Sequence, residues 1–554
     1  MNPIYKDLQK IIKGNVDTNE AVRANYRFDA SIYELTPQAI VHPHNGRDVE
    51  KIVRFVAKNK SDYPSLAITP RSAGTDMSGA AIGSSLVLDM TTNFSKIHKL
   101  NGSLLALQPG VFVRDIDSLL AQHQLMLGCA PASRAICTIG GMVGNNAGGE
   151  QSLRYGNTDR WVRVLDVVLS DGNTYRFQPL NRRELNQKLK LDNFEGDLYR
   201  QVYKLIDDNY DTIKNARPKV NKNSMGYNIW DVWDKQTGIF DMTKLLTGSQ
   251  GTLGIITDMI FETVPKPQHT GLLLAYLTSP KQLDEIIPTV MKHRPATFEG
   301  FDDITFNLGV KYFSGFRKQL GTRELLKQQA RLLKSVAKFK GHLPNIVLMI
   351  EMEGDSEAEV YHKIAKLADD LKKYKLRLDI ESDEEGSAPF WQIRRASLSL
   401  LRNKVKDKYA SPFIDDMTVQ PRYLPEFLPQ VRRIIRKHKL PATLAGHFGD
   451  GNFHIIPLMD IDNPKEQAKL EPVMRELIPI VLKYKGTMAG EHNDGMIRGP
   501  WLPAVFGDEM YAIFKQVKTI FDPQNIFNPH KKTDASWDYS MEHIRQGSDQ
   551  ALIK

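Results

Sequence analysis

The sequence predicts an α+β protein with more than one domain, and three observations support that class. Short apolar runs alternate with amphipathic helical segments along the chain, as in the strand-like run 84–90 and the helical run 48–60. From residue 269 onward this alternation becomes regular. Pro265 and Pro267 mark a boundary between the two regions. A chain of 554 residues has room for two or three domains with separate cores.

Composition is that of an ordinary globular protein, with 41% hydrophobic and 25% charged residues. The net charge of +9 is spread along the chain. This is typical of a solvated basic surface and would also favour contact with anionic lipid or an acidic partner protein, but it does not indicate nucleic-acid binding. Cys129 and Cys137 are too few for a disulfide framework or an iron–sulfur cluster. No apolar run is long enough for a membrane-spanning helix. We therefore expect a cytoplasmic protein, with peripheral contact at the inner face of the membrane left open.

The N-terminal region is expected to begin with a helical lead-in over residues 1–36. After it we expect helices over 48–60 and 113–123, strands over 65–70 and 84–90, and a hairpin over 161–177 with its turn at Asp171-Gly172. The polar, basic residues 180–240 predict a surface excursion with helices.

The C-terminal region is expected to form an antiparallel sheet with helices. Strands are expected over residues 272–279 and 345–353, and helices over 280–292, 322–338, 356–374 and 508–521. A polar tail with little order is expected over 536–554.

One segment of this region, Gly446–His454 (GHFGDGNFH), holds two histidines separated by a turn signal. On one continuous strand His447 and His454 would point to opposite faces. The Asp450-Gly451 step predicts a turn that folds the segment back, so that both rings can converge on one point.

A second segment, residues 490–495 (GEHNDG), adds Glu491 and His492. Two histidines and one carboxylate are a ligand set that suits a divalent metal with open coordination positions, and the remaining histidine could act as a base. Any one of these histidines taken alone is better explained as a hydrogen-bonded core residue. Residue types therefore leave a metal or catalytic site and a structural role both open.

Three glycine-rich loops indicate an extended anionic cofactor. They are RSAGTDMSGA (71–80), TIGGMVGNNAGG (138–149) and GSQGTLG (248–254). Glycine lets backbone N–H groups approach an anion closely, as a pyrophosphate requires. None of the loops has the pattern of a nicotinamide-type Rossmann site or a P-loop. Each alone is more typical of a structural turn, and the set predicts one nucleotide cofactor.

Together with LQPGV (107–111), RYG (154–156), NSMGYN (223–228) and FDPQNIFNP (521–529), these segments resemble FAD-binding flavoproteins of the vanillyl-alcohol-oxidase type. Within that group the chain is similar to the family of D-lactate dehydrogenase, D-2-hydroxyglutarate dehydrogenase and the flavin-binding subunit of glycolate oxidase. The resemblance runs from Pro37 to Pro529. It implies a two-lobed FAD-binding domain over 37–265, an antiparallel-sheet cap (substrate) domain over 266–480, and a C-terminal FAD-linked helical segment over 481–535 that completes the site.

The resemblance also implies noncovalent FAD, because Thr75 and Asp76 stand where some relatives carry the histidine that attaches the flavin. Its pyrophosphate is expected on the loops 71–79 and 138–149. The residues expected to bind FAD are Arg71, Ser72, Ala73, Gly74, Thr75, Ser78, Gly79, Pro131, Ser133, Thr138, Gly140, Gly141, Gly144, Asn145, Asn146, Gly148, Gly149, Tyr155, Gly251, Ile255, Ile256 and Asn528.

In the hydroxy-acid branch, the histidines of the first motif and the glutamate of the second bind a divalent metal. This implies His447, His454 and Glu491 as ligands of zinc or manganese, and His492 as the base. The implied reaction oxidises a D-2-hydroxy acid, lactate-like or 2-hydroxyglutarate-like, to the 2-oxo acid. The metal would lower the pKa of the substrate hydroxyl, His492 would take its proton, and the C2 hydrogen would leave as hydride to flavin N5.

A substrate carboxylate calls for a fork-shaped cation. FWQIRRAS (390–397) resembles the W-x-x-R segment of the family, which nominates Arg394 as a catalytic residue. Arg395 and Arg498 are neighbouring candidates, although a surface salt bridge explains each of them better.

Three residues depart from the family pattern. Asn493 replaces a glycine in GEHG, and asparagine tolerates a left-handed backbone better than most residues. Ile414 stands where some 2-hydroxy-diacid enzymes place a lysine, which weakens any transfer of 2-hydroxyglutarate specificity. His530 replaces the glycine of NPGK, which we expect to alter only a loop.

Two other functions stay open. One is a non-catalytic or partner-dependent FAD-binding subunit of a glycolate-oxidase-type complex. The other is a flavoenzyme without net redox chemistry, like the ether-lipid synthase relatives. In the leading hypothesis electrons pass to oxygen or to a separate acceptor, which could be a quinone, an electron-transfer flavoprotein, a cytochrome or an iron–sulfur subunit. The sequence predicts no oligomeric state.

Overall fold

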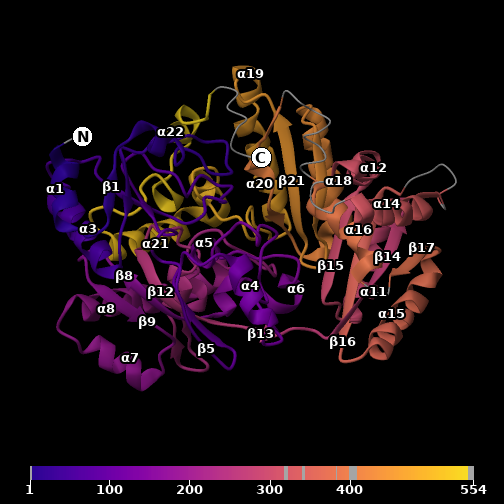
Figure 1. Cartoon of the computed structure of the whole chain (residues 1–554), viewed down its shortest axis with the longest axis horizontal. Helices are drawn as coiled ribbons and strands as arrows, with labels where there is room; N and C mark the ends of the chain where they lie inside the picture. The colour runs from indigo at the N-terminus through magenta and orange to yellow at the C-terminus, as the bar shows by residue number, and fades with distance from the viewer. Residues whose placement is uncertain are drawn as a thin grey trace.

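The computed structural model describes residues 3–316, 322–337, 339, 344–381, 384–397 and 408–546. The N-terminal half forms one side of the molecule and the large sheet of the C-terminal half forms the other, and the chain then returns to the N-terminal side (Figure 1). Both helices and antiparallel sheets are present, so the predicted α+β class is confirmed.

The first lobe, within residues 3–316, is built on a four-stranded sheet in the order β1-β2-β4-β3. Its strands are β1 (Asn15–Asp17), β2 (Ala39–His42), β3 (Ile68–Arg71) and β4 (Leu86–Asp89), with β2, β4 and β3 parallel. Helices α1 (Pro3–Ile11) and α3 (Gly46–Asn59) bury apolar side chains in the same core. The expected lead-in is thus only partly helical, since residues 15–17 pair with β2.

The second lobe, in the same described range, is a five-stranded antiparallel sheet. Its strands, in spatial order, are β5 (Ile97–Asn101), β6 (Leu104–Leu107), β12 (Ile255–Glu262), β8 (Val162–Val168) and β9 (Thr174–Phe177). The predicted hairpin is the pair β8–β9. The main helices of this second lobe are α4 (Val113–Ala121), α5 (Ile139–Asn145), α7 (Arg182–Leu189), α8 (Phe194–Asp208) and α9 (Tyr210–Ala216).

Residues 180–240 differ from the expected surface excursion. Helix α8 buries Leu198, Tyr199 and Val202 in the core of the second lobe. The many polar residues of this stretch lie on the outer faces of helices whose apolar stripe packs inward.

The C-terminal half contains, in the part of the chain that the structure describes, an eight-stranded sheet in the order β17-β14-β16-β15-β20-β21-β18, with β19 paired to β21. The strands are β14 (His269–Leu277), β15 (Thr297–Asp302), β16 (Ile346–Gly354), β17 (Arg377–Glu381), β18 (Tyr409–Ala410), β19 (Met417–Thr418), β20 (Ala442–His447) and β21 (Asn452–Met459). Their pairing is antiparallel, as the sequence predicts.

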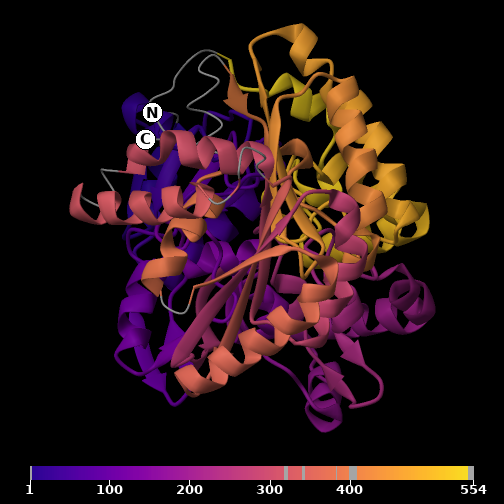
Figure 2. The ribbon, with the colours of Figure 1, turned by 90° about the vertical axis from the view of Figure 1, so that its right-hand side faces the viewer.

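Helices cover both faces of this sheet (Figure 2). One face carries α11 (Leu283–Lys292), α15 (Glu357–Leu371), α18 (Leu424–Lys437) and α20 (Leu470–Lys483). The other carries α12 (Asp303–Tyr312), α14 (Thr322–Ala337) and α16 (Glu384–Arg395). Because strand side chains alternate, Leu273 of β14 packs under the first group of helices and Leu272 under the second.

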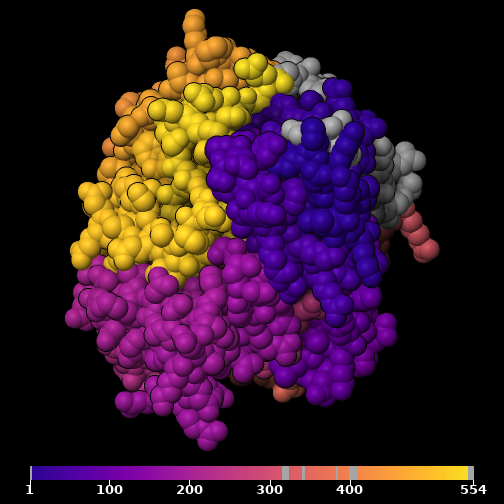
Figure 3. All heavy atoms as spheres, turned by 90° about the vertical axis from the view of Figure 1, so that its left-hand side faces the viewer, coloured from indigo at the N-terminus to yellow at the C-terminus, as the bar shows by residue number. Residues whose placement is uncertain are grey.

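The C-terminal segment packs against the N-terminal lobe. Helix α21 (Leu502–Phe521) is interrupted at Gly507, whose φ is +80°, so its regular part begins where the predicted helix begins. Helix α22 (Trp537–Glu542) follows, and Ile544 pairs with Tyr33. Figure 3 shows this segment lying beside the N-terminal residues. The expected tail is therefore folded up to this pairing, and residues 547–554 lie outside the described residues. Among the described residues no helix is both long and apolar enough to span a bilayer.

Candidate functional site

The hairpin β20–β21 brings His447 and His454 onto one face of the large sheet. Asn452 pairs with His447, and His454 pairs with Ala445, so the predicted turn lies between the two strands. Gly451 in this turn has a φ of +70°, and a Cβ there would lie 1.8 Å from the Val419 carbonyl oxygen, so only glycine fits.

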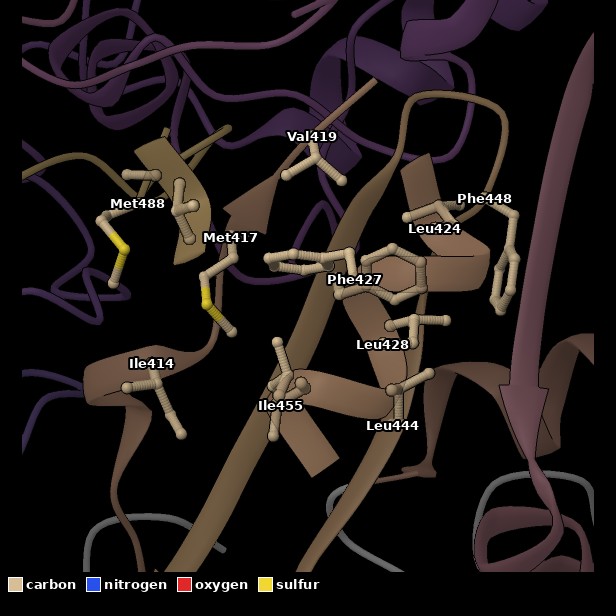
Figure 4. Close-up of a cluster of buried hydrophobic side chains, with 14 of the residues drawn as sticks. Ile414, Met417, Val419, Leu424, Phe427, Leu428, Leu444, Phe448, Ile455 and Met488 are labelled. Atoms are coloured by element: carbon tan, nitrogen blue, oxygen red, sulfur yellow. The ribbon is translucent and has the colours of Figure 1, made fainter. Parts of the chain in front are cut away.

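The opposite face of the hairpin is anchored in the hydrophobic core. Leu444 and Ile455 point toward Phe427 and Leu428 of α18 (Figure 4). This alternation fixes the register of both strands, because a shift by one residue would move the histidines into the core.

Glu491 completes a cluster with these two histidines. His447 Nε2 and His454 Nε2 each lie 3.2 Å from Glu491 Oε1, and one ligand atom from each residue lies within 4.8 Å of the others. His447 Nδ1 faces Glu299 Oε1 at 2.5 Å. His454 Nδ1 donates to the Asp415 carbonyl oxygen at 3.1 Å. Since both Nδ1 atoms face acceptors, both Nε2 lone pairs can face a single cation, and the donor set fits a divalent metal.

The segment that carries Glu491 is fixed by Asp416. The Asp416 carboxylate accepts the backbone N–H groups of Glu491 at 2.8 Å and His492 at 2.6 Å, and the Asp416 carbonyl accepts that of Gly490. Its other carboxylate oxygen accepts the Asn452 side chain at 2.9 Å. Sequence reasoning missed Asp416, although the consecutive acids of PFIDDMT (412–418) are a signal that could have found it.

His492 is oriented by a second buried acid. Its Nδ1 lies 2.7 Å from Asp415 Oδ2, and its Nε2 lies 4.0 Å from Glu491 Oε1. Burial by itself lowers the pKa of His492, but Asp415 and Asp416 outweigh burial and raise it to about 10. Asp415 also pairs with the buried Arg498. Because Arg498 is fully buried, its ion pair is not on the surface, and its side chain is not accessible to a substrate.

Lys222 is a buried cation that the sequence analysis did not single out. Its Nζ lies 2.9 Å from Glu491 Oε2, 3.6 Å from Asp450 Oδ2 and 3.3 Å from the Gly149 carbonyl oxygen. Burial would raise the pKa of Glu491, but Lys222 and His447 hold it well below its usual range. The position of Lys222 just before the NSMGYN motif is the available sequence signal.

The two consecutive arginines of α16 have different surroundings. Arg394 is buried, and its Nε and Nη2 lie 3.0 and 2.8 Å from Glu299 Oε2. Arg395 is exposed and forms a bidentate pair with Glu150 at 2.7 and 2.8 Å, which agrees with the salt-bridge interpretation. Of the two, only Arg394 is connected to the histidine cluster, through Glu299.

A cavity between the two N-terminal lobes is lined by the glycine-rich loops. The backbone N–H groups of residues 72–75 have no hydrogen-bond acceptor among the residues that the structure describes. Such free donors in a glycine-rich loop fit a pyrophosphate. The expected FAD-binding residues that line the cavity are Arg71, Ser72, Ala73, Gly74, Thr75, Thr138, Gly140, Gly141, Gly144, Asn145, Gly251, Ile255 and Ile256.

The remaining expected FAD-binding residues do not line that cavity. They are Ser78, Gly79, Pro131, Ser133, Asn146, Gly148, Gly149, Tyr155 and Asn528. Some hold the cavity walls together, as Asn528 does by donating to the Ala80 and Gln250 carbonyls at 2.9 and 2.8 Å. Gly148 lies beside Glu491 instead, because a Cβ there would lie 2.8 Å from Glu491 Oε2. Sequence reasoning missed Pro70, Asp76, Ala80, Ala81, Pro109, Ser249, Gln250 and Gly254, which flank or lie within the motifs, and Met90, which directly follows β4.

The departures from the family pattern are accommodated. Asn493 has a φ of +62°, which confirms the expected left-handed backbone, and its amide donates to the Asn145 and Gly248 carbonyls at 3.1 and 2.9 Å. His530 likewise has a φ of +63°. Ile414 is buried in the core next to Met417.

The chain matches two family models in order. Residues 37–178 match an FAD binding domain and residues 266–532 match the C-terminal domain of FAD linked oxidases. A D-2-hydroxyglutarate dehydrogenase of Escherichia coli (strain K12) is 26% identical over 543 residues, which cover 94% of this chain and 51% of that protein. The chain therefore spans about half the length of that relative. Glycolate oxidase subunit GlcD of Bacillus subtilis (strain 168) is 27% identical, with 93% of each chain covered.

Among solved structures, 4-ethylphenol oxidase from Gulosibacter chungangensis aligns with a TM-score of 0.67 at 14% identity, covering 97% of both chains, which shows a likeness of fold. The cavity is lined by residues within 70–145 of the first matched region and by residues within 249–256, which lie between the two matched regions, and the histidine–glutamate cluster lies in the second. Fold, motifs and family models agree: the chain carries an FAD binding domain and the C-terminal domain of FAD linked oxidases, and it is related to proteins named D-2-hydroxyglutarate dehydrogenase and glycolate oxidase subunit GlcD.

Proposed function

We propose that this chain oxidises a D-2-hydroxy acid to the 2-oxo acid, using noncovalent FAD and a divalent metal, zinc or manganese. The observation that carries this proposal is the convergence of His447, His454 and Glu491 ligand atoms within 4.8 Å of one another, next to the His492 ring. Relatives named for D-2-hydroxyglutarate and glycolate oxidation support the same substrate class.

FAD, the metal, His492 and Asp415 have separate roles in the proposed reaction. When bound, FAD accepts hydride and the metal lowers the pKa of the substrate hydroxyl. His492 takes the hydroxyl proton at Nε2, while Asp415 keeps the ring oriented through Nδ1 and stabilises the imidazolium. A divalent metal held by His447, His454 and Glu491 would lower the pKa of His492 from its value of about 10 and so prepare it to accept a proton.

Arg394 is the proposed ligand of the substrate carboxylate. Glu299 occupies its Nε and Nη2 groups, and Nη1 has no acceptor among the described residues. That group can donate to a carboxylate bound beside the metal. The electrons would then leave to a separate acceptor, which could be a quinone, an electron-transfer flavoprotein, a cytochrome or an iron–sulfur subunit.

Anaerobic visible spectroscopy of the purified, FAD-loaded protein tests the proposal. We expect the D-form of one acid among lactate, 2-hydroxyglutarate, malate and glycerate to bleach the flavin, and its L-form not to. Prior chelation should abolish the bleaching and added zinc or manganese should restore it. A yellow protein that none of these acids bleaches would favour a partner-dependent FAD-binding subunit. A protein that takes up no FAD would contradict the cofactor assignment itself.

A further inference from the structure

Glu299 is a buried carboxylate that joins Arg394 to His447. It lies in β15 directly opposite His447 of β20, and 1% of its surface is exposed. One of its oxygens faces His447 Nδ1 at 2.5 Å, and the other accepts from Arg394 at 2.8 and 3.0 Å. Both oxygens are therefore engaged, one by a proposed metal ligand and one by the proposed carboxylate ligand.

We propose that Glu299 is a positioning residue that fixes the metal-binding tautomer of His447 and at the same time holds Arg394 for the substrate. This inference rests on the proposed function. Only a ring nitrogen without a proton can bind a metal. An ionised carboxylate accepts hydrogen bonds and cannot donate them, so the His447 proton belongs on Nδ1. The lone pair then lies on Nε2, which is the atom that faces Glu491 at 3.2 Å.

Arg394 fixes which way a glutamine at position 299 would turn, because a guanidinium can donate hydrogen bonds but cannot accept them. In a Glu299→Gln variant the amide has one oxygen and one NH2 group. The oxygen would turn to Arg394, which leaves the NH2 group facing His447 Nδ1. Nδ1 must then accept, so the proton moves to Nε2 and blocks the lone pair that the metal needs. The substitution keeps the size of the side chain and changes only where the proton can lie.

Metal titration of full-length, FAD-loaded protein that has been freed of metal measures the effect, at a pH near 9, where proton competition at His447 no longer separates the variants. Glu299→Gln is expected to weaken zinc or manganese binding about 10- to 100-fold, the usual loss when the partner of a metal-bound histidine is removed. The double variant E299Q/R394L is expected to recover much of this loss, because the amide oxygen is then free to accept from Nδ1.

Glu353→Gln is the matched control. Glu353 is also buried in the same sheet and also pairs with an arginine, Arg154, but it contacts no histidine among the described residues. The control is expected to bind metal like the wild type. FAD uptake and thermal unfolding of each variant show whether it is folded.

Wild-type affinity in E299Q would overturn the inference, and so would a double variant that binds no tighter than E299Q. Nitrogen-15 NMR of zinc-loaded wild type adds a measurement that needs no variant, because a zinc ion on His447 Nδ1 would also overturn the inference. None of these results bears on flavin bleaching by the wild type. A wild type that binds neither zinc nor manganese would instead contradict the proposed function, and the inference would fall with it.

Discussion

At the scale of the residue, acidic neighbours control the protons of the histidine cluster. Burial by itself lowers the pKa of His447, but Glu299 outweighs burial and raises it to about 9. Burial likewise lowers the pKa of His492, but Asp415 and Asp416 outweigh it and raise that pKa to about 10. Without a metal both rings are therefore protonated at neutral pH, and a cation must displace the proton from His447 before it can bind.

Metal affinity should consequently rise with pH. Because the metal competes with one proton below the His447 pKa of about 9, we expect the apparent association constant to increase about tenfold per pH unit from about pH 7 upward and to level off near that pKa. Titration of zinc or manganese at several pH values, with a pH indicator to count released protons, checks this. Affinity that does not change with pH would contradict the assignment of His447 as a ligand.

His492 should affect the chemistry without affecting metal content. Replacing it by asparagine removes the proposed base, so we expect flavin reduction by the substrate to slow about 10²- to 10⁴-fold. The metal content should stay at the wild-type level, because His447, His454 and Glu491 remain. Stopped-flow absorbance and elemental analysis measure the two quantities. His438→Asn is a suitable control, since His438 pairs with Glu476 away from the cluster. Unchanged flavin reduction in the His492 variant would rule out its role as the base.

At the scale of the element, the β20–β21 hairpin is the unit that builds the cluster. Its turn converts a sequence spacing that separates two histidines into ring centroids 5.1 Å apart. Its core face fixes the register, while Glu299 in the adjacent strand fixes the orientation of one ring.

Gly451→Ala should disrupt this unit. A Cβ at this position meets the Val419 carbonyl at 1.8 Å, and the backbone is left-handed, so we expect a loss of more than about 2 kcal/mol in stability together with weaker metal binding. Gly102→Ala separates the two causes. Gly102 has a φ of +58°, and a Cβ added there would meet nothing within 4 Å, so only the backbone penalty of about 1–2 kcal/mol applies. Chemical denaturation compares the variants, and equal losses would show that the contact with Val419 does not matter.

At the scale of the whole molecule, distant segments close around one cavity. Residues 70–76 come from the first lobe, while residues 138–145 and 249–256 come from the second. Asn528, from the C-terminal segment, connects both lobes through Ala80 and Gln250. A ligand in this cavity therefore contacts parts of the chain that separate when the protein unfolds.

FAD should stabilise the whole fold by mass action. At about 100 times its dissociation constant it would add about 2.7 kcal/mol to the free energy of unfolding. Thermal unfolding of the FAD-free protein at increasing FAD concentrations should show a rising midpoint. Gly74→Val should reduce the rise, because a β-branched residue is strained in this left-handed backbone and its Cβ would displace the Arg71 side chain that lines the cavity. A wild-type midpoint that does not respond to FAD would argue against this cavity as the FAD site.

Local patterns in the sequence were sufficient for the fold class, the glycine-rich loops, the turn in the histidine hairpin and the residues of the cluster, whereas the left-handed Asn493 was expected only because it replaces a family glycine. These features depend on neighbours within a few positions, so spacing and turn chemistry reveal them. Residues 180–240 were misjudged as surface, because polar composition hides an apolar stripe that only helix packing makes visible.

Only the tertiary structure decided which partners hold the cluster in place. Glu299 lies 148 positions from His447, and Lys222 lies 269 positions from Glu491. Arg498 looked like a surface cation and is a buried partner of Asp415. No local pattern encodes such pairs, since a buried charge is recognised by the counter-charge that the fold brings to it. The sequence by itself therefore determined which side chains could react, and the tertiary structure determined their protons, their orientation and their charge balance.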